Sequence, residues 1–154
     1  MDIEQKLVEM NVKLPTSIAP MANYATCVRT GNLLYTSGAS CFKDGKPVYQ
    51  GKLGKELSIE QGYEASRLTA LNILSTLKHE LGSLNKIKRF IKILGFVNST
   101  DDFIGQPEVI NGASDLFVEV LGEKGIHTRS AIGTNVLPLN IPVEIEVIVE
   151  IKED

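Results

Sequence analysis

The sequence predicts a single α+β domain over residues 1–154, in which two helices pack on one face of a β-sheet. Three observations favour this fold class. A hairpin-like pair of strands comes first, two amphipathic helical segments then enclose a further strand-like run, and two strand-like runs end the chain. The length fits one domain of ordinary size, and neither an internal linker nor a short repeat divides the chain.

The first twenty residues are expected to form a short helix and an irregular lead-in to the domain. Ile3, Leu7 and Val8 follow helical spacing within residues 3–11. Residues 14–20 contain two prolines, which favour an irregular path over either kind of regular structure.

A hairpin and a long loop are expected next. Residues 24–29 and 33–37 are strand-like, and the turn residues between them include a glycine and an asparagine. Residues 39–57 are rich in glycine and lysine and should form an exposed loop. Within that loop we expect a turn at residues 43–46 and one short strand at most, around Val48.

Two helices are expected on either side of a central strand. Ser58 can cap the first helix, with Gln61 in the reciprocal capping position, and Gly82 can end it. Pro107 suits the first turn of the second helix. Between the helices, residues 87–97 are rich in β-branched and apolar residues, which is typical of a strand that is covered on both faces.

The last two strands are expected at residues 129–137 and 143–151, with only the five residues 138–142 between them. A connection this short predicts antiparallel strands, either adjacent or one strand apart. Apolar residues alternate with glutamates in the second run, so one face should pack on the helices. The other face is half polar and is either wet or buried against another subunit.

Composition and charge exclude several classes of protein. Net charge is −3 with a pI near 5.5, and no basic block is present, which argues against nucleic-acid binding. Neither a signal peptide nor an apolar run near the ~20 residues of a membrane span is visible, so a soluble, cytoplasmic protein is expected. Cys27 and Cys41 are too few for a disulfide framework or a zinc site, so no metal is expected.

Two charged residues stand at the heads of the last two strands. Arg129 could hold a carboxylate through two parallel hydrogen bonds. Glu144 could orient or deprotonate a water molecule. The alternative is that both are ordinary polar residues at strand ends.

The expected geometry separates these two groups within one chain. If the strands are antiparallel and each residue begins its strand, Arg129 and Glu144 lie at opposite ends, roughly 25 Å apart. One small substrate cannot span that distance, so a shared site needs residues from different chains. The alternative is a monomer in which the two residues do unrelated jobs.

The order of elements and several short motifs together resemble the RidA family, also called the YjgF family, of reactive-intermediate deaminases. The resemblance covers most of the chain from about Tyr24 onward. It rests on the first hairpin over residues 30–38, on Asn72-Ile73-Leu74 and Asn111 in the two helices, and on Arg129-Ser130, Leu137-Pro138 and residues 143–146 at the C-terminal end.

The resemblance implies a mixed sheet of the chorismate-mutase type, closed into a homotrimer with a pocket between neighbouring subunits. It implies that Arg129 grips the carboxylate of a small metabolite and that Glu144 orients water. It also implies that Tyr24 lines the mouth of the pocket. Gly38, Asn111 and the backbone of Ala131 would complete the pocket wall.

The chain departs from the family pattern close to the arginine. Ala131 stands where the family often has cysteine, and His127-Thr128 replaces the common Pro-Ala. The segment before Tyr24 and the loop from residue 41 to residue 57 also depart from it. These departures concern the identity of the substrate more than the fold.

The leading functional hypothesis is hydrolysis of reactive 2-imino and 2-enamino acids to 2-keto acids and ammonia, without a metal or cofactor. A second hypothesis is a binding module that holds small carboxylates, such as 2-keto acids, in the same pocket without catalysis. A third comes from an older label of the family, endoribonuclease. The acidic pI and the lack of a basic patch interleaved with aromatic residues argue against a nuclease.

Overall fold

The computed structural model describes residues 1–17, 19–20 and 22–153, so position 18 of the irregular lead-in, and positions 21 and 154, lie outside the described residues. The helices are α1 (Ile3–Glu9), α2 (Ile59–Leu81) and α3 (Gln106–Leu121), with short 3-10 turns at Leu84–Lys86, Gly122–Gly125 and Pro138–Asn140. The strands are β1 (Cys27–Thr30), β2 (Leu33–Thr36), β3 (Phe42–Lys43), β4 (Lys46–Pro47), β5 (Ile87–Asn98), β6 (Thr128–Thr134) and β7 (Val143–Ile151).

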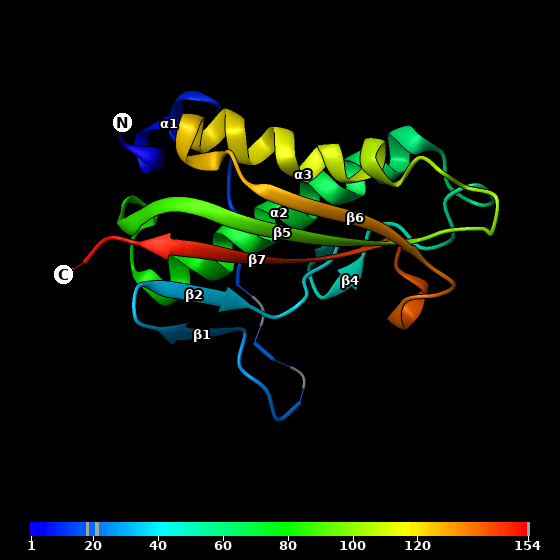
Figure 1. The fold of residues 1–154 in the computed structure, drawn as a ribbon, viewed down its shortest axis with the longest axis horizontal. Helices are drawn as coiled ribbons and strands as arrows, with labels where there is room; N and C mark the ends of the chain where they lie inside the picture. The colour runs from blue at the N-terminus through cyan, green and yellow to red at the C-terminus, as the bar shows by residue number, and fades with distance from the viewer. Residues whose placement is uncertain (18, 21, 154) are drawn as a thin grey trace.

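Five strands form one mixed sheet in the order β1-β2-β7-β5-β6, in which only β5 and β6 run parallel. Figure 1 views this sheet from its open face, with α2 behind it and α3 along the β6 side. The predicted α+β class and the packing of both helices on one face are confirmed. The expectation that β6 and β7 are antiparallel is also confirmed, and β5 lies between them.

Local signals in the sequence explain where α2 begins and ends. The Ser58 hydroxyl accepts a hydrogen bond from the Gln61 backbone N–H at 3.2 Å, and the Gln61 side chain accepts one from the Ser58 N–H at 2.9 Å. Gly82 ends the helix with a φ of 75°, a left-handed conformation that glycine adopts at little cost. The predicted capping box and C-cap are therefore confirmed.

The core lies between the sheet and the two long helices. In β7, Val143, Ile145 and Val147 are buried against the helices, while the intervening glutamates point to the open face. The helices approach each other closely at Gly112, where an added Cβ would collide with backbone atoms of Tyr63 in α2. The alternation along β7 fixes which of its side chains face the helices. The pairing of β7 with β5, and of β5 with β6, extends this assignment to the other two strands.

Two strand boundaries differ by three residues from those the sequence predicts, and one loop has a different structure. β1 begins at Cys27 because its partner β2 ends at Thr36, opposite Cys27. β6 ends at Thr134, level with the last residue of β5, beyond which it has no partner. The loop after residue 38 contains a two-stranded hairpin, β3 and β4, rather than one strand around Val48. No helix within the described residues is long and apolar enough to cross a membrane.

Candidate functional site

Arg129 lies on β6 and is held by two side chains of α3. Its Nη1 donates to Asn111 Oδ1 at 2.8 Å and to Ser114 Oγ at 3.1 Å. Asn111 and Ser114 are three positions apart, so they share one face of α3. Ala131 lies two residues after Arg129 on the same side of the strand and packs against the core. Three of the predicted site residues, Arg129, Asn111 and Ala131, are therefore brought together.

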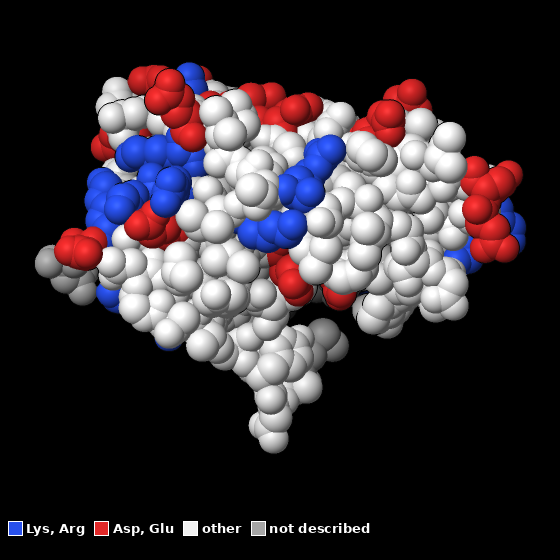
Figure 2. Space-filling view, viewed as in Figure 1, with Lys and Arg blue, Asp and Glu red and all other residues white. Residues whose placement is uncertain are grey.

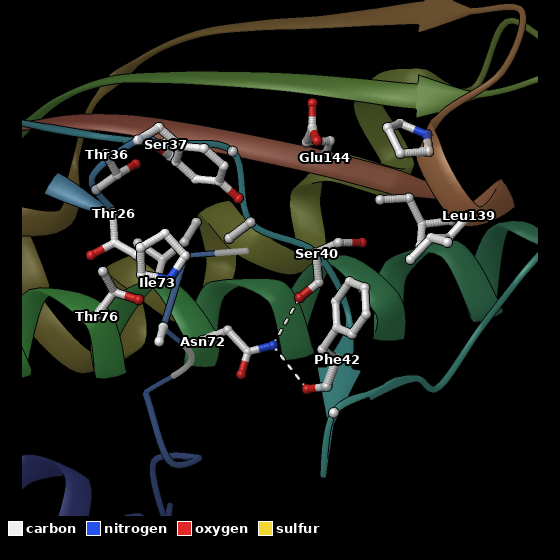
Figure 3. A pocket seen from close by; sticks show the side chains of 18 of the residues that line it. Thr26, Thr36, Ser37, Ser40, Phe42, Asn72, Ile73, Thr76, Leu139 and Glu144 are labelled. Atoms are coloured by element: carbon white, nitrogen blue, oxygen red, sulfur yellow. Dashed lines mark hydrogen bonds between the residues drawn. The ribbon is translucent and has the colours of Figure 1, made fainter. Parts of the chain in front are cut away.

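The other three predicted site residues meet at a cavity of about 420 Å³. Tyr24, Gly38 and Glu144 all line it. Figure 3 shows Glu144 at one rim of the cavity, with its carboxylate directed away from α2, and Asn72 and Thr76 of α2 on the far side. The Asn72 amide donates to the carbonyl oxygens of Ser40 at 2.8 Å and Phe42 at 3.0 Å, which fixes that wall.

Gly38 gives Glu144 the space that its side chain occupies. A Cβ built at Gly38 would lie 2.8 Å from both Cγ and Cδ of Glu144. Any residue larger than glycine would therefore push the carboxylate aside. The requirement for glycine here is one of close approach and not of backbone conformation.

Burial and a like charge both act on the Glu144 carboxyl. Removal from water raises the pKa of Glu144 above its ordinary value, and the negative charge of Glu146 raises it further. Glu144 is the only charged side chain among the described residues that line the cavity. One chain therefore supplies a carboxylate to the cavity but no cation that could bind an anionic substrate.

The side chains of Arg129 and Glu144 leave opposite faces of the sheet. Arg129 pairs with Ile93, which faces the helices, whereas Glu144 pairs with Phe96, which faces the open side. Because partners in neighbouring strands share a face, one chain cannot direct both groups into one small cavity.

The predicted separation of Arg129 and Glu144, roughly 25 Å, is wrong. β6 begins level with the middle of β5, so the two residues are offset by three positions along β5 and by two strand spacings across it. Their Cα atoms are therefore about 14 Å apart. The two side chains are kept apart because they point to opposite faces of the sheet, and not because they lie at opposite ends of their strands.

Two residues beside Arg129 were not assigned a role from sequence. The Ser114 hydroxyl contacts both Arg129 Nη1 and His127 Nε2, the latter at 3.0 Å. The sequence signal for Ser114 was its position three residues after Asn111, since residues three apart lie on the same face of a helix. Residues of α2 in the cavity wall, such as Thr76, carried no such signal.

No group of three or more metal-ligating side chains occurs in the described part of the chain.

The raised pKa of Glu144 predicts how a Glu144→Gln variant depends on pH. Between the ordinary and the raised pKa the folded protein binds more protons than the unfolded chain, so stability falls as pH rises through that window. We expect Glu144→Gln to be more stable than wild type at pH 7.5, by a margin that shrinks toward pH 4.5. Thermal unfolding of the two ligand-free proteins across this range measures the margin, and a margin that grows as pH falls contradicts the assignment.

The chain and its fold have clear counterparts among known proteins. A family model described as "YjgF/chorismate mutase-like, putative endoribonuclease" matches residues 4–151. Protein TCP17 of Trypanosoma cruzi is 38% identical over 151 residues, which cover 97% of this chain and 94% of that protein.

Two solved structures show how far the fold is shared. The protein Atu1372 of Agrobacterium tumefaciens, whose function is unknown, is 44% identical with a TM-score of 0.91, over 97% of this chain and 92% of the other. RidA from the Antarctic bacterium Psychrobacter sp. PAMC 21119 is 25% identical with a TM-score of 0.61, over 88% and 94% of the two chains.

Proposed function

The chain belongs to the YjgF/chorismate mutase-like family, and from that premise we propose that it hydrolyses 2-imino and 2-enamino acids to 2-keto acids and ammonia in a cleft between two copies of the chain. One observation carries the proposal. Each copy has Arg129 on one face of its sheet, and on the other it has Glu144, a carboxylate at the rim of a cavity to which the described residues supply no cation. The two halves are complementary only when they come from different copies.

Arg129 is prepared to bind a carboxylate. Its Nη1 uses both hydrogens on Asn111 and Ser114, and no described residue accepts a hydrogen bond from the Nε–Nη2 edge, so this edge can meet a ligand. That edge presents two parallel N–H groups, the arrangement that matches the two oxygens of a carboxylate. A charge-assisted contact of this kind contributes about 1.5–3 kcal/mol.

Glu144 is placed to act on water. Its raised pKa makes the carboxylate a stronger base than an exposed glutamate. In the proposed reaction the oxygen of water adds to the imine carbon, the carbon–nitrogen bond breaks and ammonia leaves, so that a 2-keto acid remains. An enamine first tautomerises to the imine. Glu144 takes one proton from the attacking water and passes it to the nitrogen, which gives a carbinolamine. As the carbon–nitrogen bond breaks, Glu144 moves the remaining hydroxyl proton to the nitrogen, so that ammonia and the 2-keto acid are formed.

The open face of the sheet provides a surface on which another copy can pack. Val28 is 61% exposed, Tyr35 41% and Ile132 45%, which is unusual for a sheet face unless another surface covers it. Figure 2 shows few charges over the middle of this face, apart from a group of basic side chains across β5 and β6 and some acidic atoms just below it. Contact of this face with the β6 edge of a neighbouring copy, where Arg129 lies, would build the clefts, and the family resemblance favours a homotrimer.

A non-catalytic binding module for small carboxylates is the second candidate. It is favoured by Ala131, which supplies no thiol where the family often has one, and it would use the same Arg129 edge. In that case Glu144 would accept a hydrogen bond from the ligand and activate no water.

A coupled assay with a pyridoxal-phosphate-dependent serine or threonine dehydratase, which releases 2-enamino acids, separates the two candidates. We expect the purified protein to accelerate keto-acid release in proportion to its concentration. Binding of pyruvate in calorimetry without any acceleration would reject catalysis and favour the binding module. RNA cleavage by wild type and Glu144→Ala alike would indicate a contaminating nuclease.

A further inference from the structure

A chain of hydrogen bonds runs from Arg129 to the backbone of the segment after α3. Arg129 Nη1 donates to Ser114 Oγ at 3.1 Å, Ser114 Oγ lies 3.0 Å from His127 Nε2, and His127 Nδ1 lies 2.6 Å from the Gly125 carbonyl oxygen. Gly125 belongs to the 3-10 turn that follows α3, and His127 precedes β6.

The chemistry of the two end groups fixes the direction of every bond in this chain. The Gly125 carbonyl can only accept, so Nδ1 of His127 carries a hydrogen. In a neutral imidazole Nε2 is then bare and can only accept, so the Ser114 hydroxyl donates to it. The guanidinium of Arg129 can only donate, and it therefore meets the lone pairs of Ser114.

The arrangement makes Ser114 a better acceptor for Arg129 than a lone serine would be. A hydroxyl that donates one hydrogen bond becomes polarised and accepts the next more strongly. His127 therefore acts on Arg129 through Ser114, without touching it in this chain of bonds.

The surroundings of His127 favour the neutral imidazole that the arrangement requires. Burial lowers the pKa of His127 and the Arg129 charge lowers it further, against an opposing effect of the Gly125 hydrogen bond. From α3, the uncharged Ser114 and the edge-on ring of Phe117, at a centroid distance of 6.5 Å, face the imidazole. Among described groups, Arg129 on β6 is the only charged one identified as acting on it.

We propose that His127, through Ser114, is a positioning residue that holds Arg129 with its Nε–Nη2 edge presented to the carboxylate of the substrate. The inference rests on the proposed function for the identity of the ligand, and on the hydrogen bonds alone for the relay. It gives a task to His127, the first residue of the His-Thr pair that replaces the family's Pro-Ala before the arginine.

Protonation of His127 would reverse the relay. Nε2 would gain a hydrogen and become a donor, so the Ser114 oxygen would receive hydrogen bonds from two cations at once. Repulsion between imidazolium and guanidinium would then release Arg129 from its bound position. Carboxylate binding should weaken as pH falls, and the effect should appear in KM for the imine and Kd for pyruvate rather than in kcat.

Three variants test the relay in the coupled assay and in pyruvate calorimetry. His127→Phe removes the bonds from the imidazole to Ser114 and to the Gly125 carbonyl, and Ser114→Ala removes the bonds from the hydroxyl to His127 and to Arg129. We expect KM and the pyruvate Kd to rise about three- to tenfold at pH 7.5 in each, with kcat little changed. His127→Gln offers an amide oxygen to Ser114 and does not titrate. It should keep near wild-type KM at pH 7.5 and lose the rise in KM that wild type shows toward pH 5.5.

Because Glu144 is present in all these proteins, its own titration cancels in the comparison of wild type with His127→Gln. Unchanged KM and Kd in both Ser114→Ala and His127→Phe, or identical pH profiles for wild type and His127→Gln, would overturn the relay. Should His127→Phe fail to fold, Ser114→Ala alone supplies the comparison of KM and pyruvate Kd with wild type at pH 7.5.

Nitrogen-15 NMR of the imidazole keeps the relay testable even if wild type neither turns over imines nor binds pyruvate. We expect the Nδ1–H tautomer in wild type and a higher His127 pKa in Arg129→Ala. An Nε2–H tautomer, or a His127 pKa that does not respond to Arg129→Ala, rejects the relay. Absence of turnover with both NMR results as expected rejects the proposed function and leaves the relay standing.

Discussion

Replacing Arg129 with alanine is expected to abolish the acceleration of keto-acid release while leaving the fold intact. The side chain is the charged group that we assign to the substrate carboxylate, and it lies on an edge strand, so its loss opens no cavity in the core. Loss of a charge-assisted contact costs about 1.5–3 kcal/mol, and loss of orientation adds to it. We expect kcat/KM to fall by at least about a hundredfold.

Arg89→Ala provides the matched control for this result. Arg89 also lies on the sheet, but its side chain is 62% exposed and pairs with Glu150 at 2.7 Å. The same loss of one positive charge there should change kcat/KM by less than about twofold. The assignment of Arg129 is contradicted if Arg129→Ala, with a wild-type circular dichroism spectrum, keeps most of the acceleration.

Replacing Gly112 with alanine is expected to cause the largest loss of stability among glycine-to-alanine substitutions within α2 and α3. A Cβ there would overlap the Tyr63 carbonyl oxygen and lie 2.9 Å from its carbon and 3.1 Å from the Arg67 nitrogen. All three atoms belong to the backbone of α2, so relief requires the two helices to separate. Overpacking of a core costs typically 1–3 kcal/mol and more where backbone must move, so we expect a net loss of about 3 kcal/mol despite the better helix propensity of alanine.

Gly62→Ala separates this effect from a general cost of filling space between the helices. Its Cβ would meet only side-chain methyl groups of Leu53 and Val109, at 2.8 Å or more, and these can shift. Urea unfolding should therefore show a clearly smaller loss for Gly62→Ala than for Gly112→Ala. Equal or greater stability of Gly112→Ala compared with wild type would contradict the close helix contact.

Much of the fold was predictable because its signals are local. The capping residues Ser58 and Gln61 mark the start of α2, and the alternation in β7 gives that strand's bounds as Val143–Ile151. The end of β6 was predicted too late because it depends on where β5 ends, and strand register is a non-local property. The same register error produced the overestimated distance between Arg129 and Glu144.

The candidate site was predictable only in part, for the same physical reason. The resemblance supplied Tyr24, Gly38 and Glu144, which line one cavity, and Asn111 with Arg129, which are hydrogen bonded. That these form two groups on opposite faces of the sheet follows from the pairing of three strands and could not be inferred from any one of them. The link from Arg129 to His127 depends on the tertiary contact between α3 and β6, for which the sequence holds no local pattern.

Subunit mixing between two inactive variants tests most directly whether the active site is shared. Arg129→Ala and Glu144→Ala are each expected to be inactive alone, because every cleft lacks one of its two charged groups. After the purified variants are unfolded and refolded together in equal amounts, a random ring of subunits holds about a quarter of its clefts intact, whatever the number of subunits. We therefore expect recovery of about a quarter of wild-type keto-acid release. Mixed oligomers, verified by mass spectrometry, that stay as inactive as the separate variants would contradict a cleft built from Arg129 of one copy and Glu144 of another.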